Sequence, residues 1–178
     1  MAVDLYDATG PGGKPQHLRF EQVQGTVAAL VLPRLAQPVV LDLQGVLKGV
    51  ERDGRVSLKG SVTPPAHAAN LAVRLEGVDM VALQPYLLRL GERSVRHGRL
   101  DLAIDAGVVD RRVRAPGQLT ITGLEFGEAE GGTFGGVGRR AVLAALKRDG
   151  RIALKFTLEG RTDDPKFSLD ESLTLRLA

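Results

Sequence analysis

The sequence contains no cysteine and no tryptophan, and aromatic residues make up only 4% of it. Without cysteine, the chain has no disulfides, no thiolate chemistry and no cysteine-based zinc site. Because aromatics are scarce, any apolar surface must be aliphatic and built mainly from Leu, Val, Ala and Ile.

The chain also lacks a concentration of charge of either sign. Its 24 Lys and Arg residues are interspersed with 21 Asp and Glu residues, which gives a net charge of +3. Adjacent basic residues occur only at Arg111-Arg112, Arg139-Arg140 and Lys147-Arg148. A surface that follows the phosphates of a nucleic acid needs denser positive charge. We therefore expect no nucleic-acid partner.

Long apolar runs are missing too. The most apolar run, Val27–Leu32, ends before Pro33 and falls well short of the ~20 residues of a transmembrane helix. The N-terminus has no basic region followed by an apolar one, as a signal peptide would require. Strand-like patterns lie at both ends of the chain, at 3–6 and 173–177. We expect the chain to be a fragment of a larger protein.

The 178 residues suffice for one domain with a continuous core, so we treat 1–178 as a single β-rich domain. Its most informative stretch is 146–169, where apolar residues alternate with polar or small ones from Arg151 to Glu159. Turn residues bound the alternation, Asp149-Gly150 before it and Asp163-Asp164-Pro165 after it. This pattern predicts a half-buried antiparallel strand followed by a second one.

Part of this stretch has a copy earlier in the chain. Residues 52–59, RDGRVSLK, align with residues 148–155, RDGRIALK, and both copies run on to a turn that contains proline. Chance is one explanation, because eight residues are few and Asp-Gly turns are common. The other is an internal repeat, in which a sheet grows by serial addition of antiparallel units.

The same alternation predicts further strands, at 3–6, 17–27, 39–46, 56–62, 71–75, 97–106, 117–126 and 173–177. Helical spacing predicts a short helix at 79–90, with Asp79 as its N-cap and Pro85 limiting its length. A second short helix is predicted at 139–147, after the glycine-rich loop 131–138. The fold class is therefore mainly β: a curved antiparallel sheet, groove-like or an open barrel or sandwich, with two short helices.

Residues suited to catalysis or metal binding are not grouped in the sequence. His17, His67 and His97 lie in unrelated contexts without metal-ligand spacing, so we interpret them as surface or strand-edge residues. No serine lies in a Gly-x-Ser-x-Gly elbow, and loop 131–138 lacks the Gly-Lys-Ser/Thr ending of a phosphate-binding loop. We expect no enzyme, no cofactor and no metal site.

The carboxylates are explained by the same strands and turns. Asp101 and Asp105 alternate with apolar residues and should lie on a solvated strand face. Asp163 and Asp164 precede a proline and are typical of a turn. Neither pair indicates a catalytic site.

The apolar side of the strands is the remaining candidate site. We assign it to Leu100, Leu102, Ile104, Leu119, Ile121, Ile152, Leu154, Phe156 and Leu158. One interpretation is an ordinary core covered by the two helices. The other is a sheet curved into a trough whose aliphatic concave face holds lipid chains, at about 0.8 kcal/mol per buried methylene.

Several segments resemble a known family. Leu75–Asp79 leading into Leu83–Tyr86, and then Gly98–Leu102, resemble successive segments of AsmA-like proteins of Gram-negative envelopes. Ala144–Ile152 is similar to that family's helix running into an Asp-Gly hairpin. Gly160 followed by Asp163–Ser168 resembles its C-terminal ending. Together these segments cover roughly residues 75–170, and the AsmA-like superfamily is related to the TamB-like group.

The resemblance implies a periplasmic protein anchored to a membrane through parts outside this chain. It also implies a non-catalytic role in envelope or outer-membrane biogenesis, with phospholipid carried along a β-groove between membranes. The expected partners are phospholipid and the remainder of a larger envelope protein. The alternative is a structural or adaptor domain with a closed core, which pairs with partner proteins through its sheet edges.

Overall fold

The structure is a computed structural model that describes residues 1–7, 16–29, 37–87, 95–126, 133–134, 137–138 and 150–170. Its main feature is one nine-stranded sheet. The strands of this sheet are β1 (Val3–Asp7), β2 (Gln16–Ala28), β3 (Val39–Leu47), β4 (Gly54–Thr63), β5 (Ala68–Asp79), β6 (Val95–Val109), β7 (Arg112–Phe126), β10 (Arg151–Arg161) and β11 (Asp164–Asp170).

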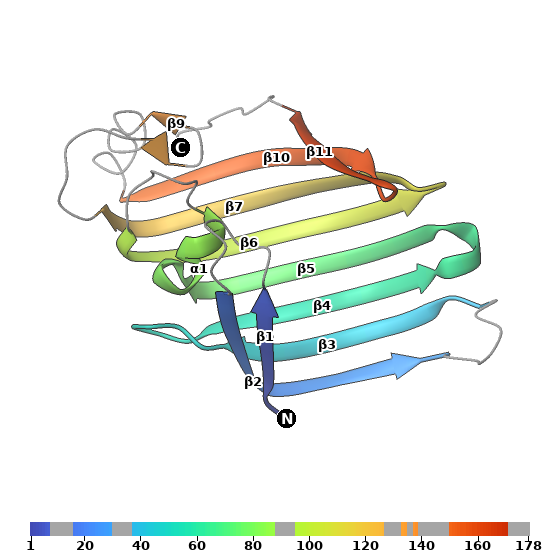
Figure 1. Cartoon of the computed structure of the whole chain (residues 1–178), viewed down its shortest axis with the longest axis horizontal. Helices are drawn as coiled ribbons and strands as arrows, with labels where there is room; N and C mark the ends of the chain where they lie inside the picture. The colour runs from blue at the N-terminus through green and yellow to red at the C-terminus, as the bar shows by residue number, and fades with distance from the viewer. Residues whose placement is uncertain are drawn as a thin grey trace.

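The strands follow one another across the sheet in chain order, and every pair is antiparallel (Figure 1). Within the described ranges β1 and β11 form the two edges, so the sheet is open and not closed into a barrel. The prediction of a mainly β, antiparallel and open fold is confirmed. Two short strands, β8 (Thr133–Phe134) and β9 (Val137–Gly138), form a separate pair where the sequence predicted a glycine-rich loop.

The strand boundaries follow the turn chemistry of the sequence. Gly54 begins β4, and Leu47 pairs with it across the hairpin that contains Asp53. At the second copy of this motif, Arg151 begins β10. The predicted helix at 139–147 and the predicted strand at 173–177 lie outside the described residues. The predicted turn at Asp163 is confirmed, since Arg161 of β10 pairs with Asp164 of β11.

The helix α1 (Met80–Leu87) begins directly after β5. Its predicted N-cap is confirmed, because the backbone N–H of Val81 donates to Oδ1 of Asp79 at 2.9 Å. The helix spans eight residues and includes Pro85. A 3₁₀ turn, η2 (Pro64–Ala66), joins β4 to β5 at the opposite end of the sheet.

Strand β2 bends sharply near its middle. Gln22 has a φ of 52°, and the pairing with β3 shifts register between Glu21 and Gln24. A bulge of this kind bends a strand and strengthens its twist. As a result, β1 and the first half of β2 swing across one face of the sheet, close to the helix (Figure 1).

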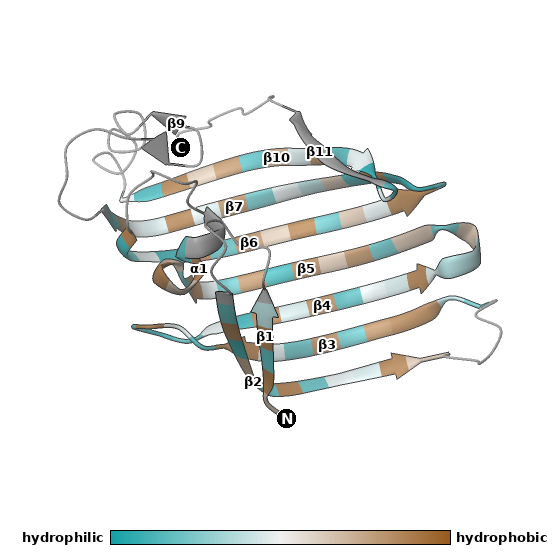
Figure 2. Cartoon of the chain, viewed as in Figure 1, coloured by the Kyte–Doolittle hydropathy of each residue, from teal (hydrophilic) through white to brown (hydrophobic). Residues whose placement is uncertain are grey.

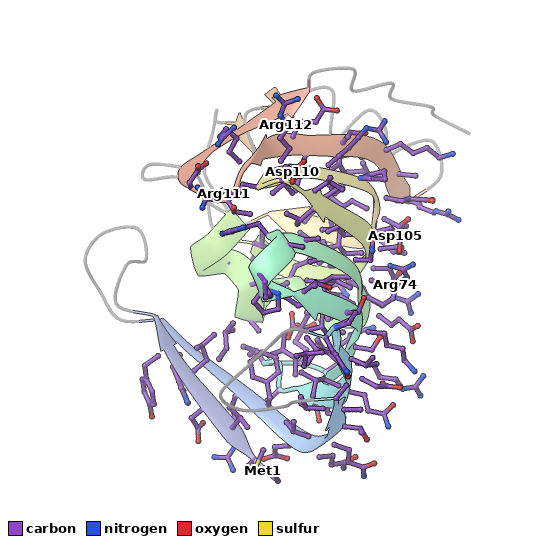
Figure 3. The ribbon with its side chains drawn as sticks, turned by 90° about the vertical axis from the view of Figure 1, so that its right-hand side faces the viewer. Met1, Arg74, Asp105, Asp110, Arg111 and Arg112 are labelled. Atoms are coloured by element: carbon purple, nitrogen blue, oxygen red, sulfur yellow. The ribbon has the colours of Figure 1, made fainter. Side chains whose placement is uncertain are left out.

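Viewed along its strands, the sheet is an arc with α1 and the β1–β2 hairpin on its concave side (Figure 3). Apolar and polar residues alternate along β3 to β7 and β10 (Figure 2), so that one set faces each side. We call the concave apolar face of β3 to β7 and β10 the trough. The end that carries the helix is the α1 end, and the end that carries η2 and the β6–β7 turn is the turn end.

The hydrophobic core lies at the α1 end of the trough. It consists of the buried residues Leu47, Val78, Met80, Val95, Leu100, Ile121, Leu124 and Ile152. Met80, the first residue of the helix, is fully buried. Leu18 and Phe20 of the β1–β2 hairpin pack against the same cluster. The helix and the hairpin therefore close one end of the trough.

Candidate functional site

The apolar side chains of the trough lie in rows that cross the sheet. The row next to the helix, which we call the closed row, consists of Leu47, Val78, Leu100, Ile121 and Ile152. Its members are all buried, with 2% of Leu100 and of Ile121 accessible. This row forms an ordinary hydrophobic core.

Farther from the helix, the rows are only partly buried. The one in the middle of the sheet, which we call the central row, consists of Leu43, Leu58, Val73, Ile104 and Phe156. Each of these side chains keeps part of its surface accessible. Between this row and the closed row lies another made of Val56, Leu75, Leu102, Leu119 and Leu154. This second row packs against the core and is also only partly buried.

The nine residues assigned to the apolar face from the sequence all lie on strands of the trough. Leu100, Ile121 and Ile152 belong to the buried core. The other six are partly buried. These are Leu102, Ile104, Leu119, Leu154, Phe156 and Leu158. The assignment thus includes both kinds of environment, which the alternation of the sequence does not distinguish.

The sequence assignment omitted the half of the trough on β3, β4 and β5. Leu43, Leu58 and Val73 lie in the same row as Ile104 and carry the face across the sheet. Their alternation was recognised, but only the strands of the C-terminal half were assigned to the face. Carrying the register through the Asp53-Gly54 hairpin would have placed them there.

Glycines make room for the two large side chains at the borders of the central row. The Phe156 ring occupies the space where a Cβ on Gly117 of β7 would lie. In the same way, the side chain of Leu43 occupies the space over Gly25 of β2. Both side chains therefore lie over the backbone of a neighbouring strand.

A hollow of about 200 Å³ lies where the β1–β2 hairpin meets the trough. Its apolar lining is Val3, Phe20, Val23, Leu43, Val56 and Leu58. Val3, Phe20 and Val23 come from the hairpin, and the others come from β3 and β4. The hairpin thus leaves an aliphatic opening beside the central row.

The convex face carries charges in cross-strand pairs, as the side chains on the right of Figure 3 show. Arg74 contacts Asp105 at 2.6 Å and donates to the carbonyl of Ile104 at 2.8 Å. Lys59 contacts Asp42 at 3.0 Å. These groups pair with one another on the outer surface, so the convex face is mainly polar and charged whereas the concave face is apolar.

The predicted surface histidines lie at exposed or partly exposed positions. His17 contacts Asp4 at 2.8 Å, His67 contacts Arg111 at 3.1 Å, and the imidazole of His97 hydrogen-bonds Glu51. In the part of the chain that the structure describes, no three or more His, Asp or Glu side chains are arranged to hold a metal ion.

The acids singled out in the sequence have structural partners. Asp101 is only partly exposed, and its Oδ1 accepts the backbone N–H of Gly77 at the bulge of β5, at 2.7 Å. Asp163 accepts two hydrogen bonds from Arg161, both at 2.8 Å. This hydrogen bonding to Arg161, with the charges of Arg161 and Arg111, lowers the pKa of Asp163 to about 2.

Asp79 is the one fully buried acid among the described residues, and the sequence predicts only its role as a helix cap. Besides Val81, its carboxylate accepts the backbone N–H groups of Val50 at 2.8 Å and Glu51 at 2.7 Å. It therefore fastens the β3–β4 loop to the start of the helix. Nearby, the hydrogen bond between Lys48 and Asp53 raises the pKa of Lys48 and lowers the pKa of Asp53.

Comparisons with protein-family models, with curated proteins and with solved structures find no match for this chain. Among the described residues, no helix has both the length and the apolar composition needed to cross a membrane.

Proposed function

We propose that this domain is a non-catalytic module that binds phospholipid acyl chains in the trough and conducts them along it. The observation that carries the proposal is the central row. Five large apolar side chains from five strands stay partly accessible on the concave face, while the convex face is charged and paired. Contiguous accessible apolar surface of this kind is uncommon on a protein without an apolar ligand or partner.

The dimensions of the trough suit an acyl chain. Strand β4 has 10 residues, which at about 3.4 Å per residue gives a face about 34 Å long. One leaflet of a bilayer core, half of ~30 Å, sets the length of a single chain at about 15 Å. Covering about eight methylenes would contribute about 6 kcal/mol before entropic costs.

The chemistry of the lining favours passage over tight selection. The central row is aliphatic except for Phe156, and it presents no charged side chain to a bound chain. Such a surface holds acyl chains of different lengths with similar affinity. The resemblance to AsmA-like proteins supports the same role, in a periplasmic protein attached to a membrane through other parts.

The closed row favours a second candidate, a structural or adaptor domain. In that case the apolar residues of the trough would serve only as the core of the fold. The edge strands β1 and β11 would pair with a partner protein. The two candidates differ in whether lipid covers the central row.

The experiment is native mass spectrometry of the purified domain, combined with lipid extraction. Ile104→Asp places a charge in the central row, whereas its neighbour Ala103→Asp places the same charge on the convex face, opposite Arg74. We expect phospholipid to co-purify with the wild type and with Ala103→Asp, and to be lost from Ile104→Asp. Circular dichroism checks that both variants are folded.

A wild-type domain that carries no phospholipid and takes up none from vesicles would contradict the proposal and favour the adaptor. So would equal loading of the two folded variants.

A further inference from the structure

The second half of β2 is an edge of the sheet that β1 does not cover. Strand β1 pairs with β2 only from Gln16 to Phe20, whereas β3 pairs with it as far as Ala28. Beyond the bend at Gln22, the outer side of β2 therefore forms the border of the sheet, at the bottom of Figure 1. Residues 24–28 are all exposed.

The direction of the backbone groups on this edge follows from a contact with the first residue of the chain. Val23 donates its N–H to the carbonyl of Met1 at 2.9 Å, and its carbonyl accepts from the Met1 amino group at 3.5 Å. Both groups of Val23 thus point outward, away from β3. Because successive residues of an antiparallel strand point their backbone groups to alternate sides, those of Gly25 and Val27 also point outward. Among the described residues, these groups have no hydrogen-bond partner.

This edge lacks the features that usually keep an edge strand from pairing. Its sequence, Gln24–Ala28, contains no charged residue and no proline. By contrast, β1 carries Asp4 and Asp7, and β11 carries Pro165 and Lys166. Charged residues and proline protect exposed edges against pairing with another chain. Of the edges that the structure describes, the second half of β2 is thus the least protected.

The same segment is complementary to itself. When two copies lie antiparallel about a two-fold axis through Thr26, Gly25 of each copy faces Val27 of the other. These two residues point their backbone groups outward, so each pair exchanges both of its hydrogen bonds. An axis through Gly25 would instead bring Val27 opposite Val23, whose groups are already bonded to Met1. Only the register centred on Thr26 pairs the outward groups of both residues.

The side chains also fit in this register. Thr26 lies on the convex face and meets its own counterpart, and Thr pairs across strands are favourable. On the concave face, Val27 is 50% exposed and becomes covered. The row of Leu43 and Gly25 runs on through Val27 and Leu41 of the second copy. Because the axis is perpendicular to the sheet, both concave faces lie on the same side.

We propose that the second half of β2 binds a second copy of this chain by antiparallel pairing of Gln24–Ala28, so that the two troughs join into one longer apolar face. A short edge gives a small interface, which belongs to the weak and transient class. The dimer therefore depends on protein concentration. The inference does not rest on the proposed function, because the edges pair whether the troughs hold lipid or are empty.

The first test uses the absence of cysteine from the chain. In Thr26→Cys, the two thiols face each other at a non-hydrogen-bonded pair, where Cα atoms lie about 4.5 Å apart, a distance that a disulfide spans. Gln118→Cys is the matched control, since Gln118 is exposed on the convex face of β7, which has a strand on each side. We expect Thr26→Cys to form disulfide-linked dimers about tenfold faster, because pairing raises the effective thiol concentration. Non-reducing electrophoresis follows the reaction.

The second test changes the charge at the axis. Thr26→Lys and Thr26→Glu each place like charges directly opposite one another, so each should be monomeric at concentrations where the wild type dimerises. An equimolar mixture of the two variants should dimerise again, because opposite charges then meet. Analytical ultracentrifugation over a concentration series measures the dimer, and circular dichroism checks that every variant is folded.

Equal cross-linking rates for Thr26→Cys and Gln118→Cys would overturn the inference, as would a mixture of the folded Lys and Glu variants that stays monomeric. If the edge accepts only a strand of another protein, the wild type stays monomeric at every concentration, and the inference is again wrong. A dimer that persists in Thr26→Lys would place the interface elsewhere and would also overturn it.

Discussion

The two ends of the trough are built from the same alternating strands and differ in what covers them. At the α1 end, the helix and the β1–β2 hairpin bury Leu100 and its row neighbours. Four residues farther along the same strand, Ile104 lies on the same face and remains partly accessible. Alternation in a strand therefore determines which residues share a face, whereas the segments that cross that face determine burial.

The largest expected effect tests the closed row. Leu100→Ala removes a side chain that is 2% exposed and should lower the free energy of unfolding by about 2–5 kcal/mol, because a cavity remains. Ile104→Ala in the central row should cost clearly less, because solvent already reaches the site. Urea unfolding of both variants measures the difference. Equal losses would mean that the central row is as well packed as the core.

The second effect concerns the hydrogen bonds by which Asp79 joins the β3–β4 loop to the start of the helix. Asp79→Ala removes the acceptor of three backbone N–H groups and should cost about 3 kcal/mol, because the donors lose their charged partner. Asp79→Asn keeps one acceptor oxygen and should cost less. Thermal unfolding ranks the two variants. Stability that is unchanged in Asp79→Ala would show that the loop is not fastened by this carboxylate.

A smaller effect tests the packing between Gly117 and Phe156, at the border of the central row. In Gly117→Val the new side chain would occupy the position of the Phe156 ring, so we expect a loss of about 1–3 kcal/mol from overpacking. Phe156→Ala in the same chain should recover part of this loss. A double-mutant cycle from denaturant unfolding gives the coupling. Additive losses would contradict the proposed contact.

The smallest effect is a pH dependence confined to the turn end. The folded pKa of Asp163 is lowered to about 2, whereas an unperturbed Asp titrates near 3.9. Its pairing with Arg161 therefore stabilises the fold fully above about pH 4, and this contribution is lost as the pH falls towards 2. Because the pair is exposed, the change should be small.

Carboxyl NMR resonances followed from pH 6 to pH 1.5 measure this titration. Asp163→Asn removes it and serves as the control for the neighbouring carboxylates. A midpoint near pH 4 for Asp163 would show that the pairing does not persist in solution.

Much of the sheet could be predicted from the sequence, because its pattern is local. Alternation from Arg151 to Glu159 and the turn at Asp163 placed β10 and β11, and Asp79 gave the start of the helix. The bend at Gln22 was not predicted, since a polar residue in an alternating strand carries no signal of positive φ. That bend is what carries the hairpin over the core.

The candidate sites depend on the register between strands, which the sequence reveals less clearly than it reveals the strands themselves. The contact between Phe156 and Gly117 follows from how β7 pairs with β10, and these strands are separated by residues 127–150. Likewise, the hydrogen bonds from the β3–β4 loop to Asp79 join residues 28 and 29 positions apart. Sequence spacing alone cannot supply such contacts.

The order of the strands also has a kinetic consequence. From β1 to β7 every strand pairs with its neighbours in the chain, so most contacts close short loops and the relative contact order is low for a β protein. Folding of this part can proceed hairpin by hairpin. Strand β10 is the exception, because it must find β7 across residues 127–150. We expect its docking to be the slow step, so Phe156 completes the central row only when the rest of the sheet has formed.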